Sequence, residues 1–144
     1  MSRIFLSLGS NLGDGPAQLD RALELLGERV GQMLAVSSYM TSEPWGFESE
    51  HLFTNAVCAM QTELTPMELL DVTQQIEREM GRTHKHAVGE SYTDRIIDVD
   101  ILTYDHLVID NERLTLPHPM MVKRDFVMIP LREVQKKLEM SSHN

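Results

Sequence analysis

The order of two helical segments among short strand-like runs limits most strongly how this chain can fold. The first segment opens at Pro16, which suits a first helical position, and leucines at helical spacing follow it as far as Val30. The second opens at Thr65-Pro66-Met67-Glu68, where a capping threonine precedes proline and, three residues on, an acid. Gly81 is a typical residue just beyond a helix end. Both helices therefore have predictable boundaries.

Four strand-like runs flank these helices, and they cover residues 4–8, 32–39, 53–61 and 97–102. The resulting order is β-α-β-β-α-β, the ferredoxin-like motif, an antiparallel sheet with both long helices on one face. We therefore predict an α+β fold in a single domain over residues 1–144. Residues 107–116 add a predicted short hairpin, and residues 126–138 a C-terminal helix disturbed at Pro130.

Asp98 and Asp100 alternate with three apolar residues on the last of these strands. Strand side chains repeat every second residue, so both carboxylates point to one face. Mg²⁺ prefers one or two carboxylates together with substrate phosphates and water. Arg95 lies close enough in sequence to meet the same anion. The pair therefore predicts a site for a Mg²⁺-bound nucleoside triphosphate, although the motif alone also fits the solvated face of an edge strand.

The charge of the chain narrows the class of partner. A formal net charge of −9 argues against a general nucleic-acid binder, which is usually basic. No apolar run approaches a membrane span, and the N-terminal one is too short for a signal peptide. The single cysteine, Cys58, suits a reducing compartment. We expect a cytoplasmic monomer that binds a small polyanion, with no nucleic acid and no membrane as partner.

Six short motifs occur in one order along the chain. They are Leu8-Gly9-Ser10-Asn11-Leu12-Gly13, Phe53-Thr54-Asn55, Gly81-Arg82, residues 94–102, residues 114–119 and Arg124-Asp125-Phe126-Val127. In this order and spacing the chain resembles, to about Leu138, the 6-hydroxymethyl-7,8-dihydropterin pyrophosphokinases of folate biosynthesis. The resemblance implies transfer of the β,γ-diphosphate of ATP to the hydroxymethyl group of the pterin, with AMP as the other product. It also implies ATP as co-substrate and two Mg²⁺ ions.

The resemblance further implies roles on the nucleotide side. Asp98 and Asp100 would hold both ions, and Arg82 and Arg95 would be catalytic, because forked guanidinium groups suit phosphate oxygens. ATP would be bound by these two arginines and by Gln74, Glu77, Lys85, Ile101, Arg113, Leu114, Thr115, His118 and Arg124. Taken singly, each arginine also fits a solvated surface cation, and His118 a turn residue.

On the pterin side the resemblance implies an amide between two aromatic rings. Asn55 can both donate and accept, as the edge of a guanine-like ring requires. Phe53 and Phe126 correspond to the stacking aromatics, although either could be a core residue. The other implied pterin-binding residues are Ser42, Pro44, Trp45 and Asp98.

The chain departs from the family before the Asp-bearing strand. Tyr92-Thr93-Asp94-Arg95-Ile96 stands where many members have Trp-Gly-Pro-Arg-Thr, and His84, Lys85 and His86 replace a run of arginines. Which of these residues meets the phosphates stays open. Two other functions also stay open: a different Mg²⁺-dependent nucleotidyl or phosphoryl transferase with the same Asp pair, and a non-catalytic ligand-binding domain.

Overall fold

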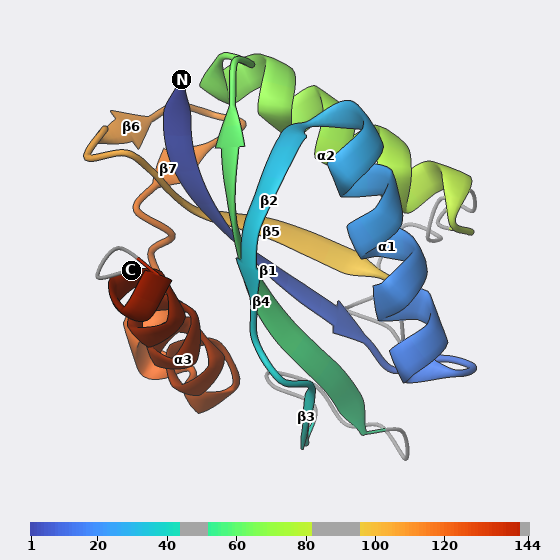
Figure 1. The fold of residues 1–144 in the computed structure, drawn as a ribbon. Helices are drawn as coiled ribbons and strands as arrows, with labels where there is room; N and C mark the ends of the chain where they lie inside the picture. The colour runs from blue at the N-terminus through green and yellow to red at the C-terminus, as the bar shows by residue number, and fades with distance from the viewer. Residues whose placement is uncertain (44–51, 82–95, 142–144) are drawn as a thin grey trace.

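The computed structural model describes residues 1–43, 52–81 and 96–141. A five-stranded sheet forms the centre, with its strands in the order β2-β4-β1-β5 and with β3 pairing the other end of β4 (Figure 1). The strands are β1 (Ser2–Ser10), β2 (Gly31–Val36), β3 (Met40–Ser42), β4 (Phe53–Thr62) and β5 (Asp98–Tyr104). Every pairing is antiparallel. The predicted mixed fold with an antiparallel sheet is therefore confirmed.

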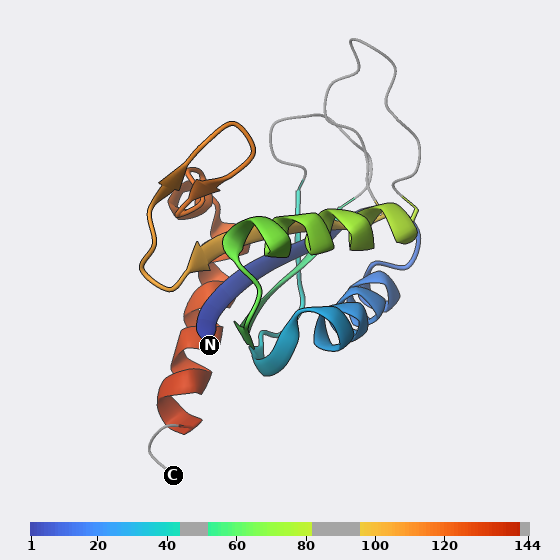
Figure 2. The same ribbon diagram turned by 90° about the horizontal axis from the view of Figure 1, so that it is seen from above.

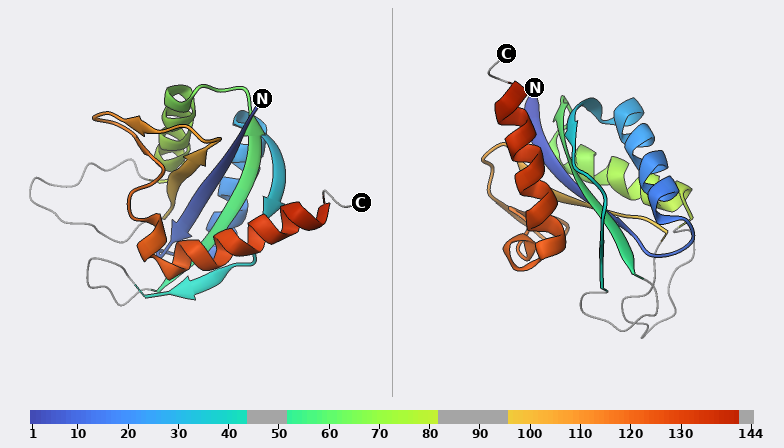
Figure 3. Two further views of the ribbon diagram at one scale, coloured as in Figure 1. Left: turned by 90° about the vertical axis from the view of Figure 1, so that its left-hand side faces the viewer. Right: turned by 60° about the horizontal axis from the view of Figure 1, so that its bottom comes forward.

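Helices cover both faces of the sheet. α1 (Gly15–Arg29) and α2 (Pro66–Glu79) lie on one face, and α3 (Asp125–Ser141) lies on the other (Figure 3). The side chains of each strand alternate between these two faces. Leu6 and Leu8 of β1 join the buried cluster of α1 and α2, whereas Val57 and Ala59 of β4 join the cluster of α3. None of the described helices is long and apolar enough to cross a membrane.

The predicted helix boundaries are close to the observed ones. Thr65 and Glu68 form a capping box, in which each side chain accepts the other's backbone N–H, at 3.2 and 2.9 Å. Gly81 follows α2 with a φ of +123°, where a Cβ would come within 2.5 Å of Ile96 Cδ1. Glycine is therefore required there for both conformation and space. α3 runs through Pro130 without a break.

The prediction of one strand over residues 32–39 was wrong. β2 ends at Val36, and the chain rejoins β4 only at Met40. Beyond β5, a two-stranded hairpin of β6 (Ile109–Asp110) and β7 (Thr115–Leu116) lies next to α2, as Figure 2 shows. A short 3-10 helix, η1 (Met121–Lys123), then leads into α3.

Candidate functional site

One cavity of about 730 Å³ gathers residues from the sheet, α2, the hairpin and the start of α3. That volume lies within the range of small-molecule sites. Every predicted site residue that falls in the described part of the chain lines it. They are Ser42, Phe53, Asn55, Gln74, Glu77, Asp98, Asp100, Ile101, Arg113, Leu114, Thr115, His118, Arg124 and Phe126. Segments more than eighty residues apart in sequence are thus brought to one place.

The two carboxylates lie on the edge strand β5, opposite small residues of β1. Asp98 pairs with Gly9 and Asp100 with Ser7, while the intervening Val99 is buried on the other face. Small neighbours leave space above the carboxylates for a ligand. Within the described residues, no group of three His, Cys, Asp or Glu side chains could hold a metal ion. Mg²⁺ is typically held by one or two carboxylates together with phosphate oxygens and water, so the chemistry of this pair suits it.

Glu77 reaches from α2 to the edge of β5, between the two aspartates. Its Oε2 accepts a hydrogen bond of 2.8 Å from the backbone N–H of Val99, and the residue is buried. An outward N–H on an edge strand otherwise lacks a partner in the sheet. The contact therefore fixes the strand segment that carries Asp98 and Asp100 against α2.

Asn55 lies on β4 with its amide oriented by β3. Its Nδ2 donates to Ser42 Oγ at 2.7 Å and lies 3.4 Å from the carbonyl oxygen of Met40. The residue is only 2% exposed. In the strand pairing it stands opposite Gly9, where a Cβ would lie 3.3 Å from Asn55 Oδ1 and 3.4 Å from Phe53 Cδ1. Glycine at this position thus keeps the floor of the cavity open.

His118 and Arg124 stand at the wall between the hairpin and α3. The His118 backbone N–H donates to Leu102 O at 2.8 Å, and its Nδ1 accepts from Met120 N at 3.2 Å. Neutral His118 therefore carries its proton on Nε2. Burial, and then the charge of Arg124, lower the pKa of His118 although Asp98 raises it. The Arg124 guanidinium carbon lies 5.6 Å from the ring centre of Phe126, a cation–π distance.

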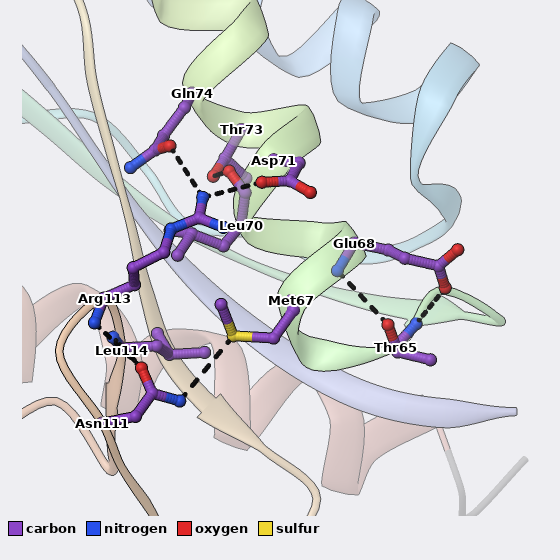
Figure 4. A network of polar contacts seen from close by, with 10 residues as sticks. All are labelled: Thr65, Met67, Glu68, Leu70, Asp71, Thr73, Gln74, Asn111, Arg113 and Leu114. Atoms are coloured by element: carbon purple, nitrogen blue, oxygen red, sulfur yellow. Dashed lines mark hydrogen bonds and ion pairs between the residues drawn. The ribbon is translucent and has the colours of Figure 1, made fainter.

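Arg113 joins the hairpin to α2 (Figure 4). Its guanidinium donates to Asp71 Oδ1 at 2.7 Å and to Gln74 Oε1 at 3.2 Å. Asn111 Oδ1 closes the hairpin turn by accepting from the backbone N–H groups of Arg113 and Leu114, both at 2.9 Å. The side chains of Arg113 and Asp71 are about half exposed or more. The ion pair therefore orients Arg113 but adds little stability.

Residues 5–136 match the family of 7,8-dihydro-6-hydroxymethylpterin-pyrophosphokinases, abbreviated HPPK. The chain belongs to this family. The 2-amino-4-hydroxy-6-hydroxymethyldihydropteridine pyrophosphokinase of Porphyromonas gingivalis is 51% identical over 135 residues, 93% of this chain and 91% of the relative. The enzyme of the same name from Methylorubrum extorquens is 40% identical over 139 residues, 96% of this chain and 85% of that one.

Two solved structures similar to this chain are considerably longer than it. An HPPK-DHPS in complex with substrates superposes with a TM-score of 0.70 at 11% identity, over 97% of this chain and 43% of that one. Wild-type HPPK-DHPS of Plasmodium falciparum with pteroate also gives 0.70, at 14% identity, over 91% of this chain and 38% of that one. The present chain thus spans about two fifths of those chains, and at these identities the likeness concerns the fold alone.

Five of the predicted site residues lie outside the part of the chain that the structure describes. They are Arg82, Lys85, Arg95, Pro44 and Trp45. Conversely, Ser7 and Gly9 line the cavity without having been predicted as site residues. Gly9 belongs to one of the ordered sequence motifs, but only the strand pairing puts it between Asn55 and Asp98.

Proposed function

We propose that this chain transfers the β,γ-diphosphate of ATP to the hydroxymethyl group of 6-hydroxymethyl-7,8-dihydropterin in folate biosynthesis. AMP and the pterin diphosphate are the products. One observation carries the proposal. In this chain, which belongs to the HPPK family, a single row across three strands joins Asn55 of β4, Gly9 of β1 and Asp98 of β5. The row therefore joins a polar amide to the first carboxylate of the Asp98–Asp100 pair.

The dimensions of that row suit a bicyclic ring. Neighbouring strands lie about 4.8 Å apart, so the backbones of Asn55 and Asp98 are separated by roughly 10 Å. Gly9 has no side chain to fill the space between them. A pterin lying over Gly9 would meet the Asn55 amide at one end and present its hydroxymethyl group near Asp98 at the other. Phe53 and Phe126, which both line the cavity, would stack on the ring.

On the nucleotide side we assign the triphosphate to cationic and N–H donors of the cavity wall. Arg124 and the Nε2 proton of neutral His118 are positioned for anionic oxygens, and Arg113 can reach from the hairpin. Arg82, Arg95 and Lys85 would contribute from the segment between α2 and β5. Gln74, Ile101, Leu114 and Thr115 complete the nucleotide side of the cavity.

Asp98 and Asp100 would hold two Mg²⁺ ions. When bound, these ions neutralise charge on the phosphates and lower the pKa of a coordinated hydroxyl. The residues of the chain then act mainly by positioning: Asn55 fixes the pterin, and Glu77 fixes the backbone between the two aspartates. Reactions of this class depend on alignment and charge stabilisation more than on covalent help from the protein.

We also propose a ferredoxin-like arrangement for the domain, taken as residues 1–144. The antiparallel strand order β2-β4-β1-β5 supports it. We propose that the enzyme works as a monomer in the cytoplasm, and that neither nucleic acid nor membrane is a partner. The acidic charge and the single buried cysteine support this view.

A turnover assay tests the proposed function. The purified chain is incubated with ATP, Mg²⁺ and 6-hydroxymethyl-7,8-dihydropterin, and nucleotide products are separated by chromatography. AMP and the pterin diphosphate in equal amounts are the expected result. ADP would instead mean transfer of a single phosphoryl group. The absence of any nucleotide product from a folded protein that binds Mg²⁺-ATP would overturn the choice of acceptor.

A further inference from the structure

The connection from β2 to β3 contains one residue more than the strand opposite it. Ser37 faces Val57, and Met40 faces Asn55, so the chain advances three residues against two on β4. The Ser37 backbone N–H donates to Val57 O at 2.9 Å, while the Val57 N–H donates to Ser37 Oγ at 3.0 Å. A hydroxyl thus replaces a strand carbonyl, and Ser38 bulges out of the ladder.

Glu133 of α3 binds this bulge. Its Oε2 accepts from the backbone N–H of Ser38 at 2.7 Å, from Ser38 Oγ at 3.1 Å and from Lys137 Nζ at 3.1 Å. Lys137 in turn donates to the carbonyl of Val36 at 2.6 Å. Val134, fully buried beneath α3, fixes the turn of helix that carries Glu133. The two side chains therefore connect α3 to the bulge at Ser38 and to the end of β2 just before it.

The charge state of Glu133 suits this role. Partial burial by itself raises the pKa of Glu133, but the hydrogen bonds from Ser38 and Lys137 outweigh burial and leave the pKa below its ordinary value. The side chain is thus an anion at neutral pH. Hydrogen bonds to a charged acceptor are stronger than those between neutral groups.

The strand that follows the bulge is short. β3 spans three residues and pairs along one side with β4. Its last residue, Ser42, accepts the hydrogen bond from Asn55 Nδ2. Any shift of β3 along β4 would move Ser42 Oγ away from that amide, and the hydrogen-bonding edge of Asn55 would turn.

We propose that Glu133 is a positioning residue for the pterin pocket: by holding the bulge at Ser38 it sets the register of β3 and, through Ser42, the orientation of the Asn55 amide. The inference rests on the proposed function for its effect on turnover. Its structural part, the coupling of Glu133 to Asn55, does not depend on that function.

Steady-state kinetics of Glu133→Ala, Glu133→Gln and Gln135→Ala test the effect on the substrate. Glu133→Ala should raise the KM for 6-hydroxymethyl-7,8-dihydropterin on the order of fivefold and leave the KM for ATP unchanged. Glu133→Gln keeps an oxygen acceptor for Ser38, so its KM for the pterin should return most of the way to the wild-type value. Gln135→Ala, an exposed position on the same helix, should match the wild type. Equal changes in both KM values, or no change in either, would overturn the proposal.

NMR of the substrate-free, ¹⁵N-labelled protein tests the coupling itself. The side-chain amide signal of Asn55 should shift in Glu133→Ala and return towards its wild-type position in Glu133→Gln. An unmoved signal would overturn the proposal even if the enzyme is active. A shifted signal in a chain that does not turn over the pterin would leave the coupling standing and refute the proposed function instead.

Discussion

The proposed pterin side and the proposed nucleotide side of the cavity are built in different ways. Asn55 is almost fully buried, its register is set by strand pairing, and its amide is held by Ser42. Arg113 stands on a short hairpin and is oriented by Asp71, with both side chains largely in solvent. Buried hydrogen bonds are costly to lose, whereas exposed ion pairs contribute little. One side is therefore pre-organised, and the other can adjust to its ligand.

Removing the Asp100 carboxylate, which lies where the two sides of the cavity meet, should have the largest effect on turnover. We expect Asp100→Ala to lower kcat by about a thousandfold or more, since charge stabilisation of the phosphates would be lost. The circular dichroism spectrum should stay unchanged, because Asp100 is not part of either buried cluster. Asp110→Ala, at an exposed position in β6, serves as the control. Activity within tenfold of the wild type would rule out the metal assignment.

A substitution on the buried pterin side should lower the affinity for the pterin and leave the affinity for ATP nearly unchanged. Asn55→Ala removes the amide and should weaken pterin binding on the order of a hundredfold, as expected for a buried hydrogen-bonding group left without its partner. Affinity for a non-hydrolysable ATP analogue should change by less than about twofold. Calorimetric titration with each ligand measures both values. Equal losses for the two ligands would contradict the division into two sides.

The floor of the pterin side offers a smaller steric test. In Gly9→Ala the new Cβ would lie 3.3 Å from Asn55 Oδ1, and we expect pterin affinity to fall about tenfold through crowding. Gly27→Ala is the matched control, since a Cβ at that helical position meets nothing within 4 Å. If the same titration gave unchanged pterin affinity for Gly9→Ala, the ring would not lie over β1.

A substitution on the exposed nucleotide side should change ligand affinity least. Asp71→Asn weakens the ion pair that orients Arg113, and we expect affinity for the ATP analogue to change by less than about threefold. The pterin affinity should not change. Because exposed charges are screened, the difference should shrink further at high ionic strength. A loss of tenfold or more would show that the nucleotide side is as rigid as the pterin side.

Local signals in the sequence predicted the elements well. The capping box at Thr65 and Glu68 is a contact between near neighbours, so it could be read directly from the spacing of the residues. The alternation around Asp98 likewise depends on the chain geometry of one strand. The division between β2 and β3 could not be predicted, because Ser38 leaves the ladder to meet Glu133, ninety-five residues later in the chain.

By itself, the sequence determined which residue types were available, which segments became helices and strands, and to which family the ordered motifs belong. Only the tertiary structure decided that Asn55, Gly9 and Asp98 form one row, and that Glu77 binds Val99 and Glu133 binds Ser38 from different helices. The reason is physical. Helix caps and strand alternation depend on near neighbours, whereas a row across a sheet depends on the register of strands that are far apart in sequence.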